Sequence, residues 1–85
     1  MPNPTEYPTP HTANPGDPLQ NGAVLVAKFF DLQGRCFIAA QYGSEHVSWY
    51  FDRNGHCHSG HYFFSGTDSE QAAKATESAK KRAKA

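Results

Sequence analysis

A short pattern, F-D-x-x-G-x-C, occurs twice in this chain, at residues 30–36 and 51–57. In both copies an aspartate opens a turn that contains a glycine, and β-branched and aromatic residues flank the turn. A type I turn followed by a glycine in the left-handed conformation commonly joins two antiparallel strands. The repeat therefore predicts two similar β-hairpins within one small antiparallel sheet.

Four segments are rich in β-branched and aromatic residues and are separated by turn residues, at 23–30, 35–42, 46–52 and 56–64. They predict four strands. Gly43 suits the first position of a two-residue type II′ turn in the middle connection. Beyond the strands, Thr67 and Glu70 form a capping-box pattern that predicts the start of a helix. We expect an α+β fold, a four-stranded antiparallel β-meander from about Ala23 to Phe64 followed by one C-terminal α-helix.

Residues 1–22 contain all six prolines and very few aliphatic side chains. Such a composition buries too little apolar area to offset the entropy lost on ordering. We therefore expect a mostly disordered, proline-rich N-terminal arm at 1–22 and a folded domain at 23–85. The arm is either a solvated tail or a segment that lies over a partner.

The formal net charge is zero, with eight Lys and Arg residues against eight Asp and Glu residues. A balanced charge disfavours a general binder of polyanions. The sequence has neither a long apolar run nor the layout of a signal peptide, which predicts a cytoplasmic protein without membrane association. Two cysteines, Cys36 and Cys57, are too few for a disulfide-rich secreted domain, so both are expected to be reduced.

The stretch RNGHCHSGH, residues 53–61, holds three of the five histidines. Alternate residues of a strand point to opposite faces, so this stretch offers at most two ligands on each face, whereas zinc sites use three or four. We expect no metal site and no cofactor. The sequence also shows no nucleophile with a base, no carboxylate pair and no phosphate-binding loop, so we do not expect an enzyme.

Pairing outward from the turns predicts two sheet faces. One carries an aromatic row of Phe29, Phe37 and Tyr50 that ends in His58, and the other is more apolar. A single helix covers one face, and the more apolar face is the expected one, which leaves the aromatic row open. The alternatives are that the helix docks on this face instead, with its alanines on the neighbouring row of small residues (Ala27, Ala39, Ser48, Gly60), or that a second copy covers it.

An open apolar patch with a polar rim is typical of a recognition surface. The predicted function is therefore non-enzymatic binding of a protein partner, or self-association as a homodimer. The expected binding residues are Phe29, Phe37, Tyr50, His58 and Tyr62, with Arg35 and Asp52 as the rim. The alternative is a nucleic-acid-binding module that uses the sheet aromatics with the basic end of the helix. The basic residues of that alternative are Lys80, Lys81, Arg82 and Lys84.

The helix junction GTDSEQAAKA resembles the corresponding junction of AP2 DNA-binding domains and of HicB-type antitoxins. The likeness covers this junction alone, and the expected strands carry only Lys28 and Arg35 where AP2-like domains read DNA with arginine-rich strands. Neither family is assigned. In size and shape the chain resembles accessory proteins of phages and plasmids, including inhibitors of host defence systems, which would imply an inhibitory role.

Overall fold

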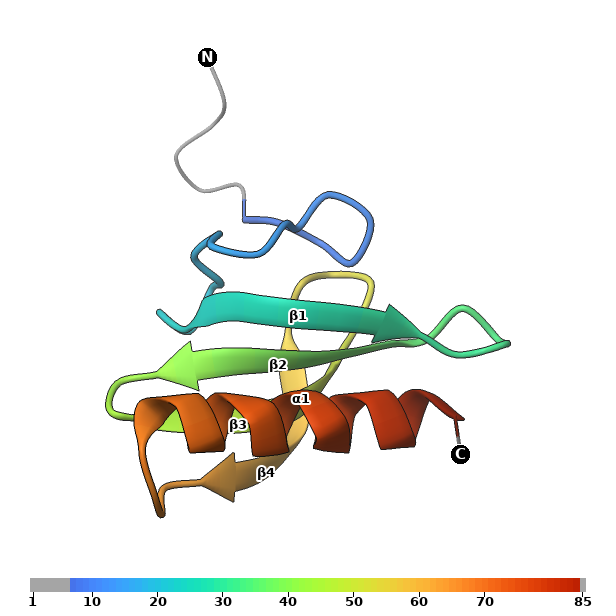
Figure 1. Cartoon of the computed structure of the whole chain (residues 1–85). Helices are drawn as coiled ribbons and strands as arrows, with labels where there is room; N and C mark the ends of the chain where they lie inside the picture. Colours follow the sequence, from blue (N-terminus) through green and yellow to red (C-terminus); the bar gives the residue numbers. More distant parts are fainter. Residues whose placement is uncertain (1–6, 85) are drawn as a thin grey trace.

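The computed structural model describes residues 7–84 and contains one antiparallel sheet and one helix (Figure 1). The strands are β1 (Val24–Phe30), β2 (Cys36–Tyr42), β3 (Glu45–Phe51) and β4 (Cys57–Phe63), and the helix is α1 (Asp68–Lys84). The strands follow the order β1-β2-β3-β4, so each pairs with its sequence neighbour. The predicted α+β meander with a C-terminal helix is confirmed.

The two repeated turns have the same geometry. Gly34 and Gly55 adopt φ angles of 84° and 82°, the left-handed conformation that the repeat predicted. In each turn the aspartate Oδ1 accepts hydrogen bonds from the backbone N–H groups two and four residues later, at 2.8–3.0 Å. These bonds satisfy turn donors that the strands leave unpaired, which explains why both copies place aspartate before the turn.

The strand register is the one obtained by pairing outward from the turns, except at two bulges. All seven pairs between β2 and β3, from Cys36–Phe51 to Tyr42–Glu45, are as expected. One bulge in β1 brings Leu25, in place of Val26, opposite Ala40. The other lies in β4, where Ser59 has a φ of 56° and the pairing shifts between Ser48 and Tyr50.

The bulge in β4 exchanges the faces of the residues that follow it. Phe63 packs on the side of α1, whereas Tyr62 packs edge-to-face with Trp49 on the opposite side. The prediction that Tyr62 lies on the face of the aromatic row was therefore wrong. An inserted residue changes the alternation of side chains, because the side-chain period of a strand is two.

Helix α1 begins as the sequence predicted. The Thr67 hydroxyl accepts a hydrogen bond from the Glu70 backbone N–H at 3.1 Å, and the Glu70 carboxylate accepts one from the Thr67 N–H at 3.3 Å. The helix covers the aromatic row, however, and not the more apolar face. Ala75 and Ala79 are fully buried there beside Phe37 and Ala39. Their small side chains let the helix lie close to the sheet.

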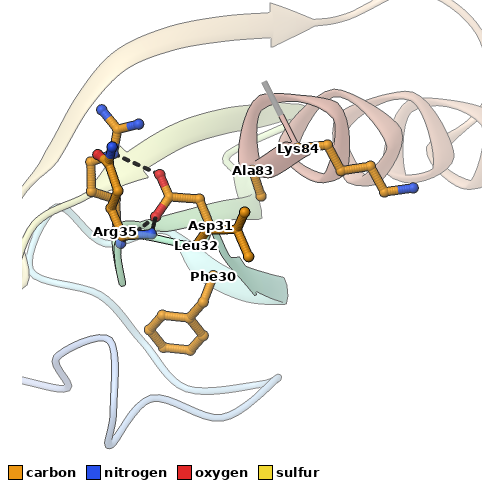
Figure 2. Close-up of a pocket in the computed structure, with 7 residues that line it drawn as sticks. Phe30, Asp31, Leu32, Arg35, Ala83 and Lys84 are labelled. Carbon is orange, nitrogen blue, oxygen red and sulfur yellow. Dashed lines mark hydrogen bonds and ion pairs between the residues drawn. The ribbon is translucent and has the colours of Figure 1, made fainter.

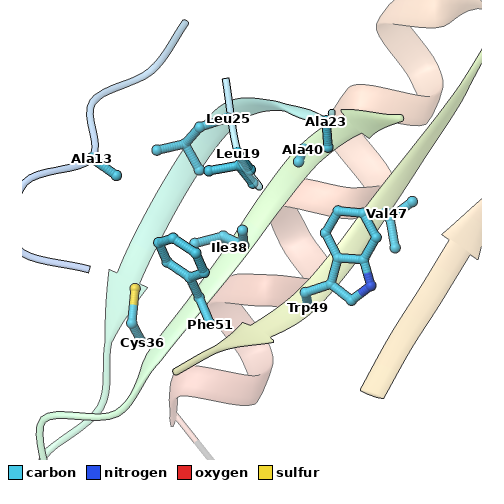
Figure 3. Close-up of a cluster of buried hydrophobic side chains, with 10 residues drawn as sticks. All are labelled: Ala13, Leu19, Ala23, Leu25, Cys36, Ile38, Ala40, Val47, Trp49 and Phe51. Carbon is cyan, nitrogen blue, oxygen red and sulfur yellow. The ribbon is translucent and has the colours of Figure 1, made fainter. Parts of the chain in front are cut away.

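The more apolar face is covered by the segment before β1 (Figure 3). Ala13 and Leu19 are buried in one cluster with Ile38, Trp49 and Phe51. This packing corrects the expectation of a disordered arm for residues 7–22, while the rest of the predicted arm, residues 1–6, lies outside the described residues. We call residues 7–22 the N-terminal segment.

Backbone and side-chain hydrogen bonds hold the N-terminal segment in place. The Gly16 N–H donates to the Leu25 carbonyl at 2.8 Å, and the Leu25 N–H donates to the Asp17 carbonyl at 3.0 Å. The Gln20 amide donates to the Asn54 carbonyl at 2.9 Å, in the turn between β3 and β4. The molecule thus has three layers, with the sheet between α1 and the N-terminal segment.

Candidate protein-binding surface

The predicted aromatic row is a packing surface for the helix. Phe37 is 8% exposed, and Phe29 and Tyr50 are half-buried beside the same helix. The guanidinium of Arg82 lies 5.3 Å from the centre of the Phe37 ring and donates to the Ser48 carbonyl at 3.0 Å. The prediction of an open aromatic face is therefore wrong, because the helix docks in the alternative position.

The two residues of the predicted rim are engaged within their own hairpins. Arg35 Nε lies 2.6 Å from Asp31 Oδ2, and His58 Nε2 lies 2.7 Å from Asp52 Oδ2. Backbone hydrogen bonding from His56, followed by the side-chain hydrogen bond from His58, lowers the pKa of Asp52 to about 2. Within residues 7–84, no three His, Cys, Asp or Glu side chains form a group suited to a metal ion.

The two cysteines are protonated thiols, and one pocket lies beside the β1–β2 turn. Both cysteines are free thiols, and burial raises the pKa of each to about 11, so they stay protonated and weakly nucleophilic near neutral pH. A pocket of about 440 Å³ lies between the β1–β2 turn and the end of α1 (Figure 2). Its acid, Asp31, is already paired with Arg35, and Lys84 is the other charged residue that lines it.

Exposed aromatic side chains gather near the end of β4. Tyr62 is 49% exposed and Phe64 is 70% exposed. Tyr42 and Tyr62 pack edge-to-face on either side of the buried Trp49, with ring centres 5.6 and 6.3 Å from the Trp49 ring. Gly60 permits this approach, because a Cβ atom there would lie 2.8 Å from both Trp49 Nε1 and Tyr62 Cε1.

The outer edge of β4 is open, whereas that of β1 is partly covered. Val24 forms an antiparallel bridge with Pro18 of the N-terminal segment, and Leu25 exchanges backbone hydrogen bonds with the same segment. No strand within residues 7–84 pairs with the outer edge of β4. Four residues of β4 are exposed: His58, Ser59, His61 and Tyr62. An open edge presents unpaired backbone donors and acceptors to another chain.

A pocket of about 420 Å³ lies between β4 and α1. His61 and Phe63 contribute to it from β4. The helix contributes Lys74, Glu77, Ser78, Lys81 and Arg82. We call this pocket the β4–α1 groove, and we use the term β4 edge surface for the open edge of β4 together with Tyr62, Phe64 and the β4–α1 groove.

Of the residues predicted for binding, only Tyr62 belongs to the exposed aromatics of this surface, and His58 lies on the same strand. The basic residues of the nucleic-acid alternative do not form one cluster. Lys81 and Arg82 line the β4–α1 groove, and Lys84 lines the pocket at the other side of the helix. Phe64 and Lys74 were not predicted from the sequence. The bulge in β4 could have been predicted, because a glycine inside a strand, here Gly60, is a known indication of a bulge.

Comparisons with known proteins return no relative: no family model, curated protein or solved structure matches the chain. Within the described residues, no helix has the length and apolar character needed to cross a membrane.

Proposed function

We propose that this protein is a non-catalytic binding module that recognises another protein through the β4 edge surface. The observation that carries this proposal is the open outer edge of β4 beside two exposed aromatic side chains, Tyr62 and Phe64. Partner chains commonly bind such an edge as an added strand, where backbone hydrogen bonds give affinity and neighbouring side chains give specificity. Exposed aromatic residues are enriched at protein interfaces.

The charge distribution supports a protein partner over nucleic acid. The chain has zero formal net charge, and its helix lysines lie on different sides of α1. The cations that do gather, Lys74, Lys81 and Arg82 in the β4–α1 groove, would neutralise only a few phosphates, and counterion release supplies most of the affinity of nucleic-acid binding. The partner is therefore proposed to be a second protein, and a second copy of this chain is one outcome that the experiment distinguishes.

The experiment is affinity capture from a nuclease-treated bacterial lysate with the native chain and three variants that have first been shown to fold. Tyr62→Ser and Phe64→Ser remove the exposed aromatics of the β4 edge surface. Leu32→Ser is the matched control, because Leu32 is a fully exposed apolar residue at the β1–β2 turn. We expect one protein to be retained by the native chain and by the control, and to be lost with the other two variants.

Retention of the captured protein by the Tyr62→Ser and Phe64→Ser variants would contradict the proposal. Capture that occurs in an untreated lysate and is lost after nuclease treatment would also contradict it. Sedimentation of the purified chain separates self-association from binding of a different protein. A dimer that dissociates in the Tyr62→Ser variant but not in the Leu32→Ser variant would assign the surface to a second copy.

A further inference from the structure

The β4–α1 groove carries an excess of positive charge. Three cations line it, Lys74, Lys81 and Arg82, against one acid, Glu77. Within residues 7–84 the ion pairs involve only Asp31 and Asp52 as acids, so neither groove lysine is in one. Arg82 differs, because its guanidinium already donates to Ser48. The two lysines are therefore available to carboxylates of a ligand.

The groove runs beside a strand edge, which determines the conformation of the ligand. A chain paired with the outer edge of β4 would lie about 4.8 Å from that strand, and every second side chain would point to the α1 side. Same-side residues of a strand are about 7 Å apart, or about 14 Å when one is skipped. Lys74 and Lys81 are seven positions apart on α1, about 10 Å along the helix axis. This separation lies between the two strand spacings, a mismatch of about 3–4 Å that long lysine side chains can bridge.

We infer that the β4 edge binds an extended acidic segment of a protein partner, which adds to the sheet as a fifth strand and directs alternate carboxylates at Lys74 and Lys81. The inference rests on the proposed function, since it specifies the chemistry of the partner at that same surface. The groove also has an apolar component in Phe63, which suits the methylene groups of glutamate side chains.

The probe is a short fluorescently labelled peptide in which glutamate alternates with threonine or valine. Its control is the same peptide with lysine in place of glutamate, and a thymidine oligonucleotide of similar charge tests nucleic acid. The protein variants are Lys74→Glu and Lys81→Glu, with Lys80→Glu as a charge-matched control, because Lys80 is exposed on the same helix and lines none of the described pockets.

We expect the native chain to bind the acidic peptide and not the lysine peptide. Lys74→Glu and Lys81→Glu should each weaken binding roughly fivefold or more, since each loses an attraction and gains a repulsion. Lys80→Glu should change it less than about twofold. Peptide addition should slow hydrogen exchange at the outward-facing amides of β4 and leave β1 unchanged.

Equal weakening by all three lysine variants would overturn the inference, because it would show only a general charge effect. Binding of the oligonucleotide without binding of the acidic peptide would overturn it in favour of nucleic acid. If the captured partner still depends on Tyr62 while Lys74→Glu and Lys81→Glu behave like Lys80→Glu, the proposed function stands and the inference about acidic partners fails.

Discussion

The packing of the N-terminal segment on the sheet can be tested by the same substitution in two similar turns. Gly34 and Gly55 occupy equivalent positions of the repeated hairpin turns, with φ angles of 84° and 82°. A Cβ atom added at Gly34 meets nothing within 4 Å, whereas one added at Gly55 would lie 2.7 Å from the Pro8 carbonyl oxygen and 3.0 Å from Gln20 Nε2. Gly34→Ala and Gly55→Ala therefore differ mainly in the contact with the N-terminal segment.

The magnitudes follow from these two environments. An alanine in the left-handed conformation costs roughly 1–2 kcal/mol, and this cost applies to both variants. The Pro8 oxygen belongs to the backbone, so relief of the contact requires the N-terminal segment to shift. Overpacking of this kind costs about 1–3 kcal/mol in addition. We expect Gly34→Ala to lower the free energy of unfolding by about 1–2 kcal/mol. Gly55→Ala should lower it by about 2–5 kcal/mol.

The assay is urea unfolding followed by the fluorescence of Trp49, which is buried in the cluster beneath the N-terminal segment. The difference between the two variants is the informative quantity, since the conformational cost cancels. Equal destabilisation by Gly34→Ala and Gly55→Ala would show that the N-terminal segment does not contact the β3–β4 turn in solution, and the three-layer arrangement would then be wrong.

Two further predictions concern the core and pH. Leu19→Ala should lower the free energy of unfolding by about 2–5 kcal/mol, as expected for a fully buried leucine. Leu32→Ala, at a fully exposed leucine, should have little effect. Similar losses of stability in the two variants, measured by urea unfolding, would refute the burial of Leu19. The pKa of Asp52 is lowered from 3.8 to about 2, so its stabilising effect is complete above pH 3.8 and is lost as the pH falls through about 2. Between these values the free energy of unfolding should fall less steeply in Asp52→Asn than in the native chain, and identical slopes in acid titrations would contradict the role given to this carboxylate.

The parts of the fold that the sequence predicted correctly are those set by local chemistry. Asp31 and Asp52 with their following glycines specify two turns, and Gly43 specifies the connection between them. A strand pair with a fixed turn at one end has its register determined, which explains why all β2–β3 pairs were predicted. The capping box at Thr67 is a local feature of the same kind.

The features that were missed depend on contacts between distant segments. The helix was predicted to cover the more apolar face of the sheet. Leu19 and Ala13 of the N-terminal segment pack there instead. A segment needs few apolar residues to order when its backbone also bonds to a strand, as at Leu25, and composition does not report such bonds. Tyr62 was predicted for binding but placed on the wrong face, because the bulge at Ser59 moves it to the opposite face.

The position of the N-terminal segment has a consequence for the order of events during synthesis. Residues 7–22 leave the ribosome before any strand on which they pack. Phe51, which shares their buried cluster, and Asn54, which accepts the hydrogen bond from Gln20 34 residues earlier, are made much later. The cluster that contains Leu19 is therefore completed only after β3 has emerged, and contacts of such long sequence separation form slowly. The first part of this domain to be synthesised thus completes its packing only when the third strand is present.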